Sequence, residues 1–221
     1  MRNKVVLAGA AALSLLAVPA LAQEEAARPV RGFQTGDFLI GSSVIGLLPL
    51  NGGNVSMIDG TPNVSDAATG QVDFTYFLSP NISLNLIAAT TRHDVEVRGS
   101  ALGTVDLGRV WALPPTLTLQ YHPLPAERYS PYVGIGLNYT VFYGEGGSRS
   151  APVTGVDIEN AWGAAVNVGM DIEFAPNWLL NFDVKKFYLR PDVKVDTSVG
   201  RIDASTRLDP WVVGAGIRYR F

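Results

Sequence analysis

Apolar and polar side chains alternate with a period of two residues along most of the chain. Between Trp162 and Phe174 every second residue is apolar, and the residues between them are small, polar or acidic. A side chain that changes face at each step is typical of a β-strand and not of a helix. The pattern predicts eight strands, at residues 36–48, 70–78, 82–92, 110–121, 131–143, 160–174, 178–189 and 206–221.

The segments between these strands alternate between short and long. The short ones are residues 79–81, 122–130 and 175–177, and the long ones are residues 49–69, 93–109, 144–159 and 190–205. Outer-membrane barrels have short periplasmic turns and long extracellular loops. The sequence therefore predicts an all-β fold, an eight-stranded antiparallel transmembrane β-barrel of the outer-membrane type. Alternation continues through residues 192–207, so we expect this last hairpin to project beyond the membrane.

A soluble β-sandwich or lipocalin also alternates, so the character of the two faces decides between the classes. In most of these strands the apolar face runs for about 9–12 residues without a charge, which matches the thickness of a bilayer. Aromatic residues gather at both strand ends, as expected for belts at the two membrane–water interfaces. The outer belt comprises Trp111, Tyr143, Trp162, Tyr188 and Trp211, and the periplasmic belt comprises Tyr121, Phe174, Trp178, Tyr219 and Phe221.

The first 22 residues have the pattern of a signal peptide. Two basic residues precede an apolar run at residues 5–18, and Ala-Leu-Ala at residues 20–22 forms a cleavage site. The apolar run is shorter than the roughly 20 residues that a membrane-spanning helix needs. We therefore expect residues 1–22 to be cleaved during export, and residues 23–221 to form the transmembrane β-barrel.

Composition narrows the possible cofactors and partners. The 221 residues include no cysteine, which excludes disulfide bonds and thiolate metal sites. The net charge is −3 and there is no basic run, so a nucleic-acid partner is not expected. The sequence contains no HExxH, EF-hand or P-loop motif, and we expect no cofactor.

Several segments, spaced in order along the chain, carry a resemblance to a known family. They are Gly70–Phe77 (GQVDFTYF), Ala88–Val95 (AATTRHDV), Leu113–Leu117 (LPPTL), Pro131–Tyr139 (PYVGIGLNY), Asn181–Lys186 (NFDVKK) and Leu208–Gly214 (LDPWVVG). With these segments the chain resembles the OmpW family of small outer-membrane proteins. The resemblance implies an eight-stranded barrel in the outer membrane of a Gram-negative bacterium. It also implies a narrow, largely hydrophobic channel associated with small apolar molecules.

The inward face of the predicted barrel carries many small residues. An eight-stranded barrel is barely wide enough to hold its own side chains, so a wide aqueous pore is not expected. Inward glycines such as Gly134, Gly136 and Gly216 either leave room for a narrow cavity or relieve crowding where the strands bend. Both interpretations stay open on the sequence alone.

Apolar residues also gather at the expected extracellular mouth. Exposed apolar clusters usually mark binding surfaces, so we expect a hydrophobic entry to the lumen there. Packing of the loops against one another is the alternative. The predicted hydrophobic mouth comprises Leu39, Ile45, Leu47, Leu48, Leu50, Met57 and Ile58.

Charged residues occupy inward positions deeper in the predicted barrel. They are Asp37, Asp171, Glu173, Asp183, Lys185, Arg218 and Arg220. Buried charges need partners, and the first and last strands of a closed barrel are neighbours. We therefore expect Asp37 to lie beside Arg218 or Arg220. The cluster is either a structural plug of ion pairs or a constriction that prevents ions from leaking through.

The outward face predicts partners in the membrane. We expect outer-membrane lipids and lipopolysaccharide around the barrel, with Lys186 either near a lipopolysaccharide phosphate or extended into water. The terminal Phe221, with Tyr219 on the same face, predicts a signal read by the barrel assembly machinery.

Three classes of function remain after these observations. The first is a passive channel or receptor for small hydrophobic solutes, and the second is a structural or adhesive surface barrel with a filled lumen. The third is a lipid-modifying enzyme, for which His93, Asp94 and Ser100 are the candidates. Their proximity in sequence is a weak signal, so we expect a protein that is not an enzyme.

Overall fold

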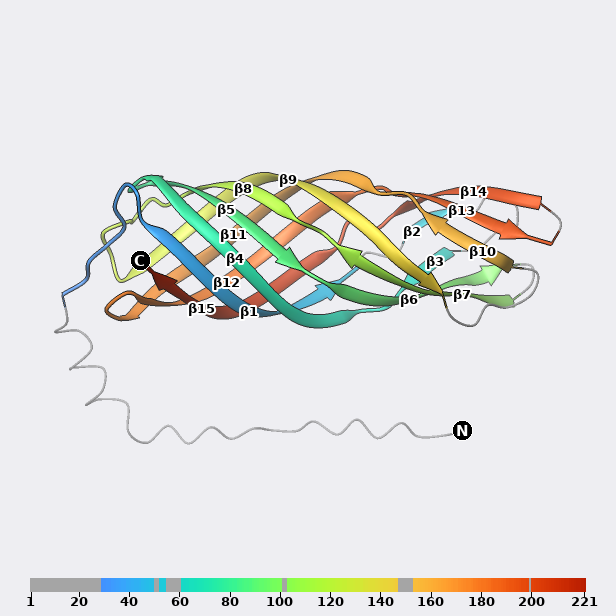
Figure 1. Ribbon diagram of the computed structural model, residues 1–221, viewed down its shortest axis with the longest axis horizontal. Helices are drawn as coiled ribbons and strands as arrows, with labels where there is room; N and C mark the ends of the chain where they lie inside the picture. Colours follow the sequence, from blue (N-terminus) through green and yellow to red (C-terminus); the bar gives the residue numbers. More distant parts are fainter. Residues whose placement is uncertain (1–28, 50–51, 55–60, 101–102, 147–152, 199) are drawn as a thin grey trace, which may run out of the picture.

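A computed structural model describes residues 29–49, 52–54, 61–100, 103–146, 153–198 and 200–221 (Figure 1). The predicted signal peptide lies outside the described residues. The strands are β1 (Phe38–Leu48), β2 (Gly52–Asn54), β3 (Thr61–Val64), β4 (Ala67–Ser79), β5 (Ile82–Ala89), β6 (Thr91–Ser100), β7 (Gly103–Leu113), β8 (Thr116–Tyr121), β9 (Tyr129–Gly146), β10 (Val153–Ile158), β11 (Ala161–Ala175), β12 (Trp178–Leu189), β13 (Asp192–Thr197), β14 (Gly200–Arg207) and β15 (Trp211–Arg220). Within the described residues, no helix has the length and apolar character needed to cross a membrane.

The predicted eight-stranded antiparallel barrel is confirmed. The ring runs β11, β12, β15, β1, β4, β5, β8, β9 and closes where β9 pairs with β11. The first and last strands pair over ten positions, from Leu39 opposite Arg220 to Leu48 opposite Trp211. Closure leaves the ring without a free edge, as β-structure inside a bilayer requires.

Two of the eight predicted strands are broken near their outer ends. The third consists of β5 and β6, which are interrupted at Thr90, and the fourth consists of β7 and β8, which are interrupted at Pro114 and Pro115. Proline has no backbone N–H and cannot donate to a ladder of hydrogen bonds. The Pro-Pro pair thus explains why β7 ends at Leu113 and the strand resumes as β8 at Thr116.

The loops predicted to be long contain strands of their own and extend the barrel outward. The predicted hairpin at residues 192–207 is confirmed as β13 and β14, which lie in a four-stranded sheet with β10 and β2. On the other side β3, β6 and β7 continue the wall. In Figure 1 this extension forms the end of the molecule opposite the C-terminus. By the rule that short turns are periplasmic, the extension is extracellular.

Alternating side chains face out of and into the barrel. In β1 the outward residues Ile40 and Val44 are 40% and 70% exposed, whereas the inward Ile45 and Leu47 are buried. The same alternation appears in β4, β8 and β12. An exposed apolar face of this size is the surface that a bilayer covers.

The periplasmic end is covered by the segment that precedes β1. The amide of Phe33 donates to the carbonyl of Pro125 at 2.7 Å, and the amide of Gly36 donates to the carbonyl of Phe77 at 2.8 Å. These bonds hold the segment beneath the barrel, where the Phe33 ring stacks on Phe77 with their centroids 4.2 Å apart. The chain therefore closes its own lower end before it enters the wall.

Candidate functional site

The lumen is divided into an apolar outer half and a polar inner half. Along β15 the inward residue near the outer end is Val212, whereas the inward residues near the periplasmic end are Arg218 and Arg220. Along β1, which pairs with β15, the inward residues change from Leu47 and Ile45 to small or polar ones at a similar level. We call the two parts the outer cavity and the polar floor.

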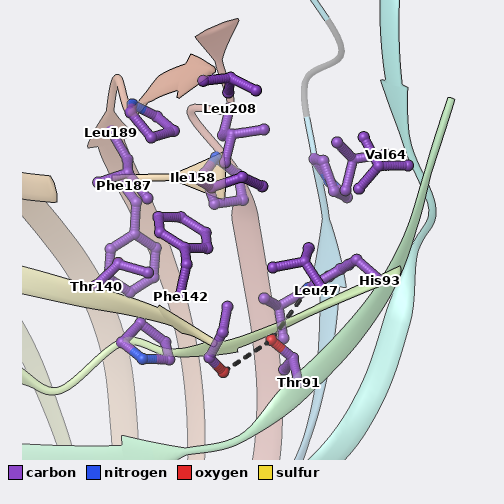
Figure 2. Close-up of a pocket in the computed structure, with 18 of the residues that line it drawn as sticks. Leu47, Val64, Thr91, His93, Thr140, Phe142, Ile158, Phe187, Leu189 and Leu208 are labelled. Atoms are coloured by element: carbon purple, nitrogen blue, oxygen red, sulfur yellow. Dashed lines mark hydrogen bonds between the residues drawn. The ribbon is translucent and has the colours of Figure 1, made fainter. Parts of the chain in front are cut away.

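The outer cavity has a volume of about 140 Å³. Its wall is built from β1, β4, β5, β6, β7, β9, β12 and β15, with the extension above (Figure 2). A cluster of buried apolar residues lies at this level, and all of its members except Ala165 line the cavity: Ile45, Leu47, Ile87, Ala89, Ala165, Phe187 and Val212. An apolar cavity of about 150 Å³ in another protein stays dry and binds benzene, so this one can hold a single ring or a short alkyl chain.

The extension adds a second apolar layer above this cluster. Val97, Val105, Leu107 and Val195 are buried together there. All four also line the outer cavity. A molecule approaching from outside therefore meets branched apolar side chains before it reaches the barrel itself.

Two polar side chains of the cavity wall, His93 and Thr91, are bonded to each other. His93 Nδ1 lies 2.8 Å from the carbonyl oxygen of Ser65, which can only accept, so this nitrogen carries the proton. Nε2 lies 3.0 Å from Thr91 Oγ1 and accepts from it. Burial lowers the pKa of His93, against the opposing effect of the Ser65 carbonyl, and favours the neutral ring. Figure 2 shows His93 and Thr91 beside Leu47.

The polar floor is organised around one arginine. The Arg218 guanidinium lies 2.9 Å from an oxygen of Asp73 and 2.9 Å from an oxygen of Asp171, and all three side chains are almost fully buried. Asn181 links Asp171 to the Tyr132 hydroxyl, with both N···O distances at 2.9 Å. Arginine presents several donors in a fixed plane, which suits a site with two carboxylates.

A further carboxylate, Asp183, extends this network upward. It accepts from the Tyr132 hydroxyl at 2.8 Å and from the Asn167 amide at 2.9 Å, and it pairs with Lys185. Lys185 is 2% exposed, so its charge is balanced inside the lumen and not by water. The network thus connects β9, β11 and β12 across the inside of the barrel.

An aromatic and ionic layer seals the periplasmic end. Phe33, Leu39, Phe77 and Leu179 form a buried apolar cluster. Arg220 pairs with Glu173 at 2.8 Å and also donates to the carbonyl of Gly32 at 2.8 Å. These contacts tie the segment before β1 to the last strand and close the lumen from below.

His122 lies in this layer, just beyond the end of β8. It is fully buried, its Nε2 is 3.1 Å from Ser83 Oγ, and its ring packs against those of Phe77 and Tyr132. Burial, and then the nearby Arg218 charge, lower the pKa of His122 to about 3. The imidazole is therefore neutral at any physiological pH.

Comparison with known proteins identifies the architecture. The model of the OmpW family matches residues 34–221. The chain belongs to the OmpW family. It is 32% identical to outer membrane protein W of Escherichia coli over 228 residues, which cover 99% of this chain and 100% of that protein. It is 39% identical over 179 residues to the uncharacterized outer-membrane protein y4mB of Sinorhizobium fredii, covering 80% of this chain and 76% of the relative.

A solved structure agrees with the fold. The crystal structure of the outer membrane protein OprG from Pseudomonas aeruginosa superimposes with a TM-score of 0.79 at 25% identity, over 87% of this chain and 99% of that one. The protein is therefore an outer-membrane β-barrel of the OmpW and OprG type. Its relatives are outer-membrane proteins.

The residues predicted to form the hydrophobic mouth divide into three groups in this OmpW-family barrel. Ile45 and Leu47 face inward and line the outer cavity. The prediction was wrong for Leu39, which lies opposite Arg220 in the periplasmic cluster, and for Leu48, which faces outward and is 46% exposed. Leu48 follows Leu47 directly, and neighbours in a strand cannot share a face. Leu50, Met57 and Ile58 lie outside the described residues.

The predicted charged residues are all buried, but one pairing was wrong. Asp37 pairs with Arg31, 2.7 Å away, and not with Arg218 or Arg220. The partner of Arg220 is Glu173, and Asp183 pairs with Lys185. Arg218 lies between Asp171 and Asp73, a residue that the sequence did not mark as a member of the network. Its inward position follows from the alternation in β4.

The inward glycines relieve crowding and do not open the cavity. A Cβ on Gly136 would lie 2.3 Å from the Leu117 carbonyl oxygen, and one on Gly216 would lie 2.3 Å from the Ser42 carbonyl oxygen. The space above Gly169 is taken by the Tyr132 ring, whose hydroxyl would lie 2.4 Å from the added carbon. The cavity lies higher in the barrel and is enclosed by larger apolar residues.

The residues predicted for the aromatic belts lie near strand ends. Trp111 stacks with Tyr143, just above the break between β7 and β8, and Trp162 at the start of β11 packs on Tyr139. At the periplasmic end Trp178 packs on Tyr219, which in turn contacts Phe221. The outer group also includes the exposed Trp211 and Tyr188. These positions fit the level of lipid headgroups.

Lys186 folds back onto the protein. Its ammonium group lies 5.1 Å from the centre of the Trp211 ring and donates to the carbonyl of Asp209. The side chain is buried, although it belongs to the outward face of β12. Of the two alternatives, extension into water does not fit this position, and the charge is held by the corner before β15.

The enzymatic candidates are not assembled as a triad. His93 bonds to Ser65 and Thr91, as described above, whereas Asp94 points outward, is 73% exposed and pairs with Arg109 at 3.2 Å. The side chain of Ser100 lies outside the described part of the structure. Among the described residues no three histidine, aspartate or glutamate side chains are grouped to hold a metal ion.

The upper part of the cavity was missed in the sequence. Val95, Val97 and Val105 were assigned to a loop, yet they belong to β6 and β7 and line the cavity. The signal was present, because Val95 and Val97 alternate with the charged Asp94, Glu96 and Arg98. Following this alternation beyond the membrane level would have found them.

Proposed function

We propose that this protein is a passive receptor and channel through which small apolar molecules cross the lipopolysaccharide layer and enter the outer membrane. The observation that carries the proposal is the outer cavity, which is lined by branched apolar residues and lies above a filled polar floor. An apolar solute gains free energy on leaving water for such a cavity. Ions and sugars gain no free energy in the cavity, because they would lose their hydration.

Release sideways into lipid is favoured over passage through the floor. Below the cavity a solute would have to displace the buried Arg218–Asp171 pair, whose separation leaves uncompensated charge. In the wall, by contrast, the β5–β8 ladder ends at Ile87 opposite Thr116, and the β6–β7 ladder begins at Thr91 opposite Ala112. Residues 88–90 and 113–115 between them form no pairs across this seam. Ala89 and Pro114 beside the break also line the cavity, so we place the exit there.

The remaining partners belong to the same proposal. Outer-membrane lipid surrounds the exposed apolar face, and lipopolysaccharide meets the outer aromatic residues such as Trp162, which is 71% exposed. Phe221 at the end of the last strand serves as the signal for the barrel assembly machinery. These assignments are supported by the membership of the family and by the positions of the residues.

The test is transport into vesicles whose outer leaflet is lipopolysaccharide, because plain phospholipid is itself permeable to apolar molecules. The mature barrel is reconstituted, and entry of an apolar fluorescent reporter is compared with entry of a small sugar. We expect selective entry of the reporter, with the signal appearing first in the lipid phase. Leu47→Arg places a charge in the cavity, and its burial should reduce reporter entry at least about tenfold.

The matched control is Leu48→Arg. Leu48 faces outward opposite Trp211 near the membrane boundary, where an arginine is tolerated. We expect this variant to transport as the unchanged protein does. Equal transport by the Leu47 and Leu48 variants, or equal entry of sugar and reporter, would overturn the proposal.

A further inference from the structure

The outer cavity has five polar or titratable side chains in its wall: Gln71, Thr91, His93, Asn138 and Thr140. Four of them are occupied with protein partners. Thr91 and His93 are bonded to each other, and the Asn138 amide donates to Thr116 Oγ1 at 2.9 Å and to the Pro115 carbonyl at 3.2 Å. The Asn138 oxygen accepts from the Thr140 hydroxyl at 2.7 Å. Only Gln71 remains to be accounted for.

The Gln71 side chain, at the base of the cavity, has a hydrogen-bond partner for only one end of its amide group. Its Nε2 donates to Ser43 Oγ at 3.2 Å, whereas Oε1 is buried and has no hydrogen-bond partner among the described residues. The side chain is 6% exposed. It lies opposite Ala89 in the ladder and one inward step above Asp73, so it occupies the boundary between the outer cavity and the polar floor.

A buried carbonyl oxygen without a donor costs free energy, and the cost is recovered when a ligand supplies one. Resting on the proposed function, we infer that the outer cavity selects small apolar molecules that carry one hydroxyl group. The hydroxyl group binds Gln71 at the base, and the apolar body lies among Ile45, Ile87 and the other branched residues above it.

The chemistry of the wall favours a hydroxyl group over a charged group. Burial lowers the pKa of His93 and so favours its neutral form, and no other ionisable side chain is among the described residues of the wall. A buried carboxylate or ammonium group would therefore lack a counter-ion. A hydroxyl group both donates and accepts, so it can satisfy the Gln71 amide whichever of its ends faces the cavity. A plain hydrocarbon would leave that amide unpaired.

The experiment compares phenol with toluene, two molecules of nearly equal size that differ by a hydroxyl in place of a methyl group. Each displaces an apolar fluorescent probe from the full mature barrel in lipid nanodiscs, and empty nanodiscs correct for partition into lipid. We expect phenol to bind about tenfold more tightly than toluene after this correction. Gln71→Leu should abolish the preference by weakening phenol about tenfold, while toluene binds as before or better.

Thr140→Val is the matched control, since it removes a polar group of the same wall whose hydroxyl is already bonded to Asn138. We expect it to keep the preference for phenol or to increase it, because Asn138 Oδ1 loses its donor. Gln71→Met serves as a second variant if Gln71→Leu does not fold, which heat-modifiable migration on a gel reports. A preference for phenol that persists in the Gln71 variants would overturn the inference, and so would its loss in the Thr140 variant.

The two proposals fail in different ways. Equal affinity of phenol and toluene for the unchanged protein would overturn the inference about the hydroxyl group and leave the apolar receptor in place. Failure of both molecules to displace the probe would overturn the proposed function itself.

Discussion

The outer and inner halves of the lumen are built from the same eight strands, but their buried side chains are stabilised in different ways. In the outer half, residues such as Ile45 and Val212 are buried without needing specific partners, and space is left between them. In the inner half, charges such as Arg218 and Asp171 are buried only because each one contacts another. Buried charges are stable only beside partners of opposite charge, whereas apolar side chains need no specific partner and can leave space between them. The cavity therefore forms above the charged residues.

In the proposed function this division also separates two tasks. The inner half would exclude water and ions, and the outer half would bind the solute. Because the polar floor lies beneath the outer cavity, a solute in the cavity would then have the membrane as its nearest apolar destination. The comparison can be tested by placing the same kind of change in each half.

The largest effect is expected from removing the charge at the centre of the floor. Arg218→Met leaves Asp73 and Asp171 buried without a cation, and we expect a loss of about 3–5 kcal/mol in the free energy of unfolding. Val212→Ala on the same strand, in the outer cavity, should cost only about 1 kcal/mol. Urea unfolding of the mature barrel in lipid measures both. Similar losses for the two variants would show that the halves do not differ as described.

A smaller effect is expected from adding a small apolar group to each half. A Cβ on Gly169, in the polar floor, would lie 2.4 Å from the Tyr132 hydroxyl and 2.5 Å from the Phe182 carbonyl oxygen, so backbone must shift, and Gly169→Ala should cost about 2 kcal/mol. Ala89→Val adds two methyl groups to a side chain that lines the outer cavity, and the same unfolding experiment should show a change below about 0.5 kcal/mol, because the cavity offers them space. A tolerated Gly169→Ala would mean that the floor is less tightly packed than its contacts indicate.

The last expected effect is gradual, a dependence on pH that belongs to the sealed end and amounts to about 2 kcal/mol over about two pH units. The folded-state pKa of His122, about 3, is below its ordinary value of 6.5, so the unfolded chain binds a proton first as the pH falls. The stability contributed by neutral His122 is present above pH 6.5 and should be lost by about 1 kcal/mol per pH unit as the pH falls toward 3. The free energy of unfolding is measured at about pH 6 and about pH 4 for the unchanged protein and for His122→Gln, and the change between the two pH values is compared. Equal slopes for the two proteins would contradict it.

Much of the fold follows from the sequence because the strands of a membrane barrel alternate between outward apolar residues and inward residues of other kinds. Six of the eight barrel strands were located to within a few residues, since an outward residue such as Val44 has to be apolar wherever lipid covers it. The other two continue beyond their predicted outer ends as β6 and β7. The inward position of the seven predicted charges follows from the same period of two. The breaks at Thr90 and at the Pro-Pro pair were not located, although proline marks such breaks in sequence.

The pairing inside the lumen did not follow from the sequence. Asp37 and Arg220 are both inward and near the same end, yet Asp37 binds Arg31, from the segment before the barrel, and Arg220 binds Glu173 across the lumen. Alternation predicts which face of the sheet a residue lies on, but not its position along the barrel axis or the direction of its side chain. In a barrel, the tilt of the strands and their register fix those positions.

The class of the protein, the number of barrel strands and the face on which their side chains lie follow from the amino-acid sequence alone, because these depend on local periodicity and on the solvent that each face meets. Where the lumen is filled and where it is open follows from the three-dimensional fold. That depends on side chains from strands far apart in sequence, such as Tyr132 above Gly169 and Gln71 beside Ser43, meeting at one level of a closed ring.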